Sequence, residues 1–126
     1  MKQLTLSVVM CLTVCFITGC WPSKMWYAIA IQNESAQDLS DVALKFDNNT
    51  FQFDFGILVD GGLKGYQNVD VPLADTATLT WKDASGDKHS ETVHFEKIHN
   101  DINYYSQSDS VIIRIAKDGS VDAQLE

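Results

Sequence analysis

Apolar side chains alternate with polar ones in short segments along most of this chain. A period of two with one apolar face is typical of half-buried β-strands, because successive side chains of a strand point to opposite sides. No segment has a convincing amphipathic helical period. The alternating apolar residues are Tyr27, Ile29 and Ile31; Val42, Leu44 and Phe46; Phe51, Phe53 and Phe55; Ala77, Leu79 and Trp81; Val93 and Phe95; Val111, Ile113 and Ile115; and Val121, Ala123 and Leu125. The sequence therefore predicts an all-β protein.

Turn residues separate these segments. Gly, Asn and Asp tolerate the positive φ of tight turns, and they gather at 47–49, 60–62, 83–87 and 118–119. They divide the chain into about eight short strands, of which 66–71 is the weakest, and 97–109 is the longest irregular stretch. Parallel strands would need crossover helices, for which there is no room. We expect an antiparallel two-layer sandwich, immunoglobulin-like, of about seven to eight strands, with a small barrel as the alternative.

The aromatic residues have two interpretations. Trp81 shares the inward parity of its segment, and the three alternating phenylalanines at 51–55 are expected in the core. The alternative for the phenylalanines is an exposed aromatic face that binds a partner. Tyr104 and Tyr105 lie in the longest irregular stretch, where aromatic residues suit recognition. The alternative for this pair is one buried and one exposed tyrosine.

The N-terminal residues differ from the rest of the chain. Lys2 is the only charge before Lys24, and residues 4–19 carry none. A helix that crosses the bilayer needs about 20 mostly apolar residues, so this run is short for a permanent span. A positive start, an apolar stretch and small residues at its end are typical of an export signal. The alternatives are a buried core helix and an uncleaved membrane anchor.

The end of this run is more specific. Ile17-Thr18-Gly19-Cys20 is an aliphatic residue, a small residue, a glycine and a cysteine. It resembles the lipobox of bacterial lipoproteins. The resemblance implies that 1–19 is a cleaved signal helix, that the Cys20 thiol carries a diacylglycerol, and that the new amino group is acylated. We then expect a lipidated tether at 20–24 and a β-sandwich domain at 25–126.

The resemblance also implies a location in the cell envelope. Three acyl chains would hold the protein on its membrane, because two or more suffice for stable anchoring. Trp21 stands where an Asp tends to retain enterobacterial lipoproteins at the inner membrane. The resemblance thus favours an outer-membrane protein that faces the periplasm. The expected partner is the membrane itself, through Cys20.

The cysteines and the net charge bear on whether the domain has disulfides and on whether it binds nucleic acid. The resemblance places Cys11 and Cys15 inside the leader and the lipid on Cys20, so no disulfide is expected in the mature domain. The chain has 9 Lys and Arg against 17 Asp and Glu, a net charge of −8. This acidic balance argues against nucleic-acid binding, which needs a basic face. No cofactor is expected.

A search for catalytic or metal-binding patterns gives little. His89, His94 and His99 are spaced by five; this spacing places strand residues on opposite faces, so a metal site or catalytic base is the less favoured interpretation. We expect His94 to face solvent. The segment 83–87 resembles a calcium loop only loosely and is interpreted as a hairpin turn. The formal glycosylation sequons at Asn33 and Asn48 are interpreted as turn residues.

Three hypotheses of function follow from the sequence. The first is a small lipid-anchored binding or adaptor module that engages an envelope protein and catalyses nothing. The second is an immunity-type inhibitor that offers carboxylates to the basic site of a toxic enzyme. The third is an enzyme, for which the sequence offers no catalytic grouping and no small-molecule substrate. The sequence does not separate the first two.

Overall fold

The alternating segments form strands in the computed structural model, which describes residues 27–48, 51–102 and 109–126. No helix occurs in these residues, and the all-β prediction is confirmed. None of them forms a helix that is both long and apolar enough to cross a membrane. The strands are β1 (Tyr27–Asn33), β2 (Leu39–Phe46), β3 (Gln52–Leu58), β4 (Leu63–Val69), β5 (Thr76–Lys82), β6 (Lys88–His94), β7 (Ser110–Ile115) and β8 (Val121–Leu125).

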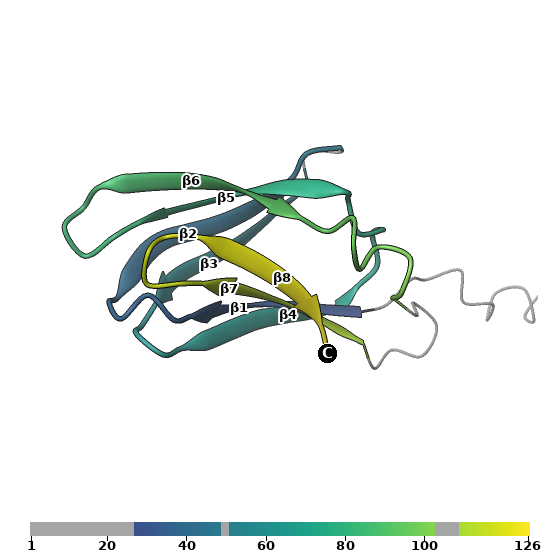
Figure 1. Ribbon diagram of the computed structural model, residues 1–126, viewed down its shortest axis with the longest axis horizontal. Helices are drawn as coiled ribbons and strands as arrows, with labels where there is room; N and C mark the ends of the chain where they lie inside the picture. Colours follow the sequence, from purple (N-terminus) through teal and green to yellow (C-terminus); the bar gives the residue numbers. More distant parts are fainter. Residues whose placement is uncertain (1–26, 49–50, 103–108) are drawn as a thin grey trace, which may run out of the picture.

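The strands form two four-stranded sheets that pack face to face (Figure 1). The first sheet has the order β4-β1-β7-β8, and the second has the order β3-β2-β5-β6. The predicted two-layer sandwich is therefore confirmed. The predicted signal helix and lipidated tether, with Cys20, lie outside the described residues, as do Tyr104 and Tyr105.

One pair of strands departs from the antiparallel prediction. β1 and β7 pair in parallel, with Ile29 opposite Val111 and Ile31 opposite Ile113. The expectation that parallel neighbours need a crossover helix was wrong here. A parallel pair needs only a long connection, and the chain between these two strands supplies one by building the whole second sheet and β4.

The core lies between the sheets and follows the predicted parity. Ile29 and Ile31 of β1 are fully buried, as is Leu44 of β2. Trp81 is buried too, at 4% exposure. The three alternating phenylalanines divide: Phe53 and Phe55 are in the core, whereas Phe51 is 41% exposed. Phe51 precedes β3 and packs with its ring 4.9 Å from that of Phe53, at the edge of the core.

A β-bulge interrupts β2 and shapes the surface of the second sheet. The register of β2 shifts between Leu39 and Val42 against β3, and between Ser40 and Ala43 against β5. Within the bulge, Asp41 has a φ of 51°, in the left-handed region that non-glycine residues seldom adopt. Bulges bend a strand and re-aim its side chains. The consequence here is that Asp41 points to solvent beside β5.

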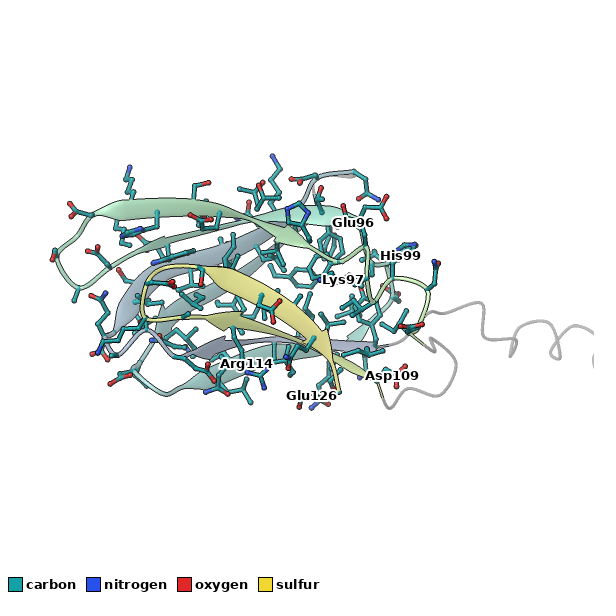
Figure 2. The ribbon with its side chains drawn as sticks, viewed as in Figure 1. Glu96, Lys97, His99, Asp109, Arg114 and Glu126 are labelled. Atoms are coloured by element: carbon teal, nitrogen blue, oxygen red, sulfur yellow. The ribbon has the colours of Figure 1, made fainter. Side chains whose placement is uncertain are left out.

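The turns gather at the two ends of the sandwich. The connections 34–38, 59–62, 83–87 and 116–120 lie at one end, which we call the turn end (Figure 1). β1 begins at the opposite end, where the C-terminus also lies. Figure 2 shows Glu96, Lys97 and His99 at this opposite end. Any tether that precedes Tyr27 thus enters the domain at the end away from these four turns.

Candidate functional site

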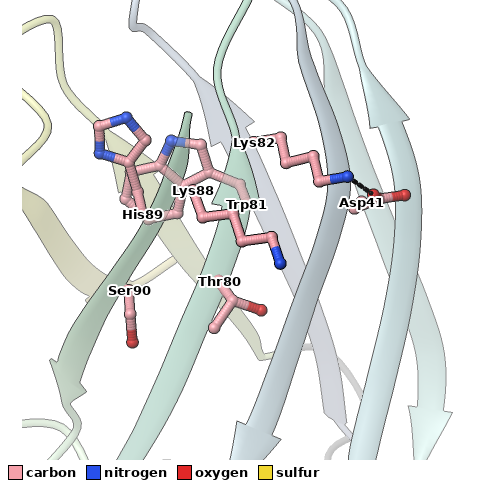
Figure 3. Close-up of a pocket in the computed structure, with 7 residues that line it drawn as sticks. All are labelled: Asp41, Thr80, Trp81, Lys82, Lys88, His89 and Ser90. Atoms are coloured by element: carbon pink, nitrogen blue, oxygen red, sulfur yellow. Dashed lines mark ion pairs between the residues drawn. The ribbon is translucent and has the colours of Figure 1, made fainter. Parts of the chain in front are cut away.

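A hollow of about 430 Å³ opens on the second sheet, near the turn end (Figure 3). Its walls come from β5 and β6 and from the bulge of β2. The side chains that matter to its chemistry are Asp41, Thr80, Lys82, Lys88 and Ser90. Trp81 and His89 complete the lining.

The β5–β6 hairpin sets these residues in rows. Lys82 pairs with Lys88 across the two strands, and Thr80 pairs with Ser90. Trp81, between Thr80 and Lys82 in sequence, has the opposite parity and is buried. Because side chains alternate along a strand, the two lysines and the two hydroxyls share the outer face of the sheet.

An ion pair crosses the hollow. Lys82 Nζ lies 3.3 Å from Asp41 Oδ2, and the two side chains are 39% and 71% exposed. Exposed pairs of this kind contribute little to stability, typically about 0–1 kcal/mol. The pair therefore adds little to the stability of the fold, and it places a carboxylate next to Lys82 at the hollow.

A second cluster lies behind the hollow, at the base of the hairpin turn. The rings of Trp81 and His89 stack with centroids 5.3 Å apart and an interplanar angle of 8°. His89 Nε2 lies 2.7 Å from Asp83 Oδ2. The other carboxylate oxygen of Asp83 accepts hydrogen bonds from the backbone N–H groups of Ser85 and Asp87. One oxygen of Asp83 thus binds the turn and the other contacts β6, and the prediction that 83–87 is a hairpin turn is confirmed.

These bonds act on the charge of Asp83. The hydrogen bond from His89, with the backbone donors of Asp87 and Ser85, holds the pKa of Asp83 below its ordinary value. A carboxyl whose pKa is lower in the folded state stabilises the fold above its ordinary pKa and loses that contribution as the pH falls through the folded value.

We therefore expect acid to weaken the hairpin. The melting temperature should decrease as the pH is lowered past about 4. In Asp83→Asn this decrease should be smaller, because the substitution removes the titrating charge while keeping an oxygen acceptor. The measurement is thermal unfolding by circular dichroism between pH 7 and pH 2.5. Asp87→Asn is the matched control. Asp87 takes part in the turn through its backbone N–H, which donates to Asp83 and which the substitution keeps. Identical pH profiles for the two variants would contradict the role of Asp83.

The histidines do not come together. His94 is exposed, as predicted, with Nδ1 3.2 Å from Glu96 Oε1. His99 Nδ1 lies 3.7 Å from Asp75 Oδ1, beyond the end of β6. Among the described residues, no three His, Cys, Asp or Glu side chains are placed to share a metal ion.

Asn33 occupies a different place from the one predicted. The sequence interpretation made it a turn residue within a formal glycosylation sequon, but it ends β1 and is 0% exposed. Its Nδ2 donates to the backbone oxygens of Gln37, Leu58 and Val59, at 2.7 Å, 2.9 Å and 3.0 Å. An amide nitrogen so enclosed has no room for a glycan. The second sequon is only partly described, because residues 49 and 50 lie outside the described range.

The fold places this chain among two-layer β-sandwich proteins. A solved structure described as "NMR structure of the protein from Eubacterium rectale" is similar, with a TM-score of 0.53 and 15% sequence identity over 85% of this chain and 94% of the other. At that identity the likeness supports the fold alone. Neither a protein-family model nor a curated protein sequence matches this chain.

The polar side chains of the hollow, on Asp41, Thr80, Lys82, Lys88 and Ser90, were not singled out from the sequence, whereas Trp81 and His89 were considered there only as a core residue and as one of three spaced histidines. The turn at 83–87 was predicted, and counting outward from it would have paired Lys82 with Lys88. Asp41 was beyond reach, because the alternation of its segment gives no sign of a bulge. The hairpin side of the hollow thus follows from a local pattern, whereas the side formed by the bulge of β2 does not.

Proposed function

We propose that this protein is a small lipid-anchored module of the cell envelope that binds a partner and catalyses no reaction. The observation that carries the proposal is the sequence Ile17-Thr18-Gly19-Cys20 at the end of an uncharged, Lys-initiated leader. Cleavage before Cys20 and acylation of its thiol and amino group would tie the domain to the outer membrane, facing the periplasm. Several buried acyl chains, at about 0.8 kcal/mol per methylene, give stable attachment.

The arrangement of the sandwich is compatible with such an anchor. Six residues, 21–26, separate Cys20 from the start of β1 in the sequence, so the domain would sit close to the membrane surface. The turn end lies opposite the start of β1 (Figure 1). Turns on a rigid sandwich are suited to recognition, and those of the turn end would face away from the lipid toward another envelope protein.

Replacing Cys20 tests the anchor. In cells that express Cys20→Ala, we expect the protein to leave the membrane pellet for the soluble fraction, or to remain as the unprocessed precursor. Mass spectrometry of the purified wild-type chain should find the mature N-terminus at Cys20 with acyl chains attached.

Cys15→Ala is the matched control, because it removes a thiol from the same leader without touching the lipobox. It should leave fractionation unchanged. Identical fractionation and mobility of Cys20→Ala and the wild type would refute the anchor.

A second candidate, an immunity-type inhibitor, is favoured by the distribution of charge. None of the 17 acidic side chains is buried, and only Asp83 and Asp109 are even partly covered. An acidic surface of this kind speeds the approach of a basic protein. If cells lacking the gene resist attack by sibling cells as well as before, the inhibitor function is excluded while the anchored binding module stands.

A further inference from the structure

We propose that the hollow on the second sheet binds a small sugar that carries an oxyanion, either a phosphate or a carboxylate. The first observation is the pairing of Lys82 with Lys88. Like charges directly opposite each other on neighbouring strands destabilise a sheet. Among the described strands this is the only register that sets two basic residues opposite one another, in a chain of net charge −8.

The described residues neutralise only one of the two ammonium groups. Lys82 forms an ion pair with the carboxylate of Asp41, which is itself 71% exposed. No described residue forms an ion pair with Lys88. The side chains of Lys82 and Lys88 extend in the same direction across β5 (Figure 3). One positive charge is thus left over at the hollow, and an oxyanion placed between the ammonium groups would remove their repulsion.

The remaining polar groups suit the hydroxyls of a sugar. Thr80 and Ser90 form the next row of the hairpin and place two hydroxyl groups beside the lysines. Each hydroxyl can donate and accept, whereas the Asp41 carboxylate only accepts. A ligand made of an anion alone would be repelled by Asp41, but a ligand with hydroxyls as well can donate to it.

The backbone of Asp41 gives an independent reason to expect a ligand. Asp41 is one of three described non-glycine residues with a positive φ, and although Asp adopts this region with less strain than most residues, such positions often occur at binding sites. Here the strain results from a bulge that brings the Asp41 carboxylate to the edge of the hollow. The volume, about 430 Å³, lies within the range of small-molecule sites, roughly 300–1,000 Å³.

The test is a titration of the full chain, ¹⁵N-labelled in detergent micelles, with glucose 6-phosphate, glucuronate, inorganic phosphate and glucose. We expect saturable shifts in the backbone amide signals of residues 80–82 and 88–90 with at least one of the two sugar anions. Glucose 6-phosphate and glucuronate distinguish a phosphate ligand from a carboxylate ligand. Glucose lacks the anion and should give no saturable shifts.

Two lysine variants make the test specific. Lys88→Ala should weaken binding by about tenfold or more, since it removes one of two charge-assisted contacts. Lys45→Ala is the control, because Lys45 is an exposed lysine of the same sheet outside the hollow. Circular dichroism should show both variants folded, as expected for exposed positions.

Several outcomes would overturn the proposal. They are the absence of saturable shifts with both sugar anions, equal weakening by Lys88→Ala and Lys45→Ala, and binding of glucose as tight as that of its phosphate. Equal affinity for inorganic phosphate would overturn the assignment of sugar hydroxyls to Thr80, Ser90 and Asp41. The Cys20→Ala chain should bind as the wild type does, so this result is independent of the anchor.

Discussion

Replacing Asn33 with alanine is expected to lower the free energy of unfolding by about 3–5 kcal/mol, a large part of the roughly 5–15 kcal/mol of a domain this size. The Asn33 side chain is 0% exposed and donates to three backbone oxygens. Its Oδ1 accepts from the backbone N–H and the hydroxyl of Ser35, at 2.9 Å and 2.6 Å. Alanine would remove all five hydrogen bonds and leave the backbone N–H of Ser35 buried without its acceptor, and such a loss costs about 1–3 kcal/mol where water cannot replace the bond. The oxygens of Gln37 and Val59 would keep the bonds that they accept from Ser35 Oγ and from the Gly62 N–H.

Asn33 is costly to lose because it joins three segments. It connects the end of β1, the 34–38 turn and the end of β3, and its own backbone exchanges hydrogen bonds with Gly61 and Gly62. Thermal and urea unfolding measure the loss, which should lower the melting temperature by at least about 10 °C.

Gln32→Ala is the matched control for Asn33→Ala. Gln32 is the neighbouring amide and also donates to the turn at Gly61, at 3.1 Å, but its side chain is only half-buried and this hydrogen bond is exposed to solvent. Its loss should cost less than about 1 kcal/mol, because water can take its place. Comparable destabilisation by the two variants would refute the view that burial makes Asn33 important.

The strands were predictable because burial on one face leaves a local mark on the sequence. In β7, Val111, Ile113 and Ile115 are fully buried while Ile112 and Arg114 are half-buried, so the alternation reports the geometry directly. The tight turns were also predictable from the sequence. Gly119 adopts a φ of 87° in the turn between β7 and β8, a conformation for which glycine carries no steric penalty.

Pairing between distant segments was not predictable in the same way. The parallel register of β1 with β7 joins residues far apart in sequence, and neither strand differs in pattern from an antiparallel one. The polarity of Asn33 predicted a surface turn, because most asparagines are exposed. What reverses that expectation is the presence of three carbonyl groups around it, two of them at the end of β3.

Long-range contacts also close the side of the sandwich. Tyr66 and Lys64 of β4 donate from their side chains to the backbone oxygens of Asp54 and Phe55 in the edge strand β3. Edge strands expose unpaired backbone groups that invite association with other chains. The alternation predicted a weak strand at 66–71, and the structure has β4 at Leu63–Val69. That β4 covers part of the edge of β3 depends on how the two sheets meet.

Replacing Gly65 with valine is expected to cost about 2–3 kcal/mol, as overpacking does in a tight contact. Gly65 lies opposite Ala30 in the β1–β4 pair. A Cβ at Gly65 would come within 2.8 Å of Ala30 Cβ and 2.9 Å of the backbone oxygen of Ile29, closer than such atoms approach in proteins. The backbone oxygen cannot turn aside as a flexible side chain could, so β4 must move away from β1.

The consequence of Gly65→Val should be local as well as global. Beyond a lower melting temperature, the amide protons of β4 that pair with β1 should exchange faster with solvent, while those of the β5–β6 hairpin keep their order of protection. Gln67→Val is the matched control, because Gln67 is an exposed residue of the same strand and valine favours strands. Unchanged protection of β4 in Gly65→Val, or equal destabilisation by Gln67→Val, would show that close packing at Gly65 does not hold β4 against β1.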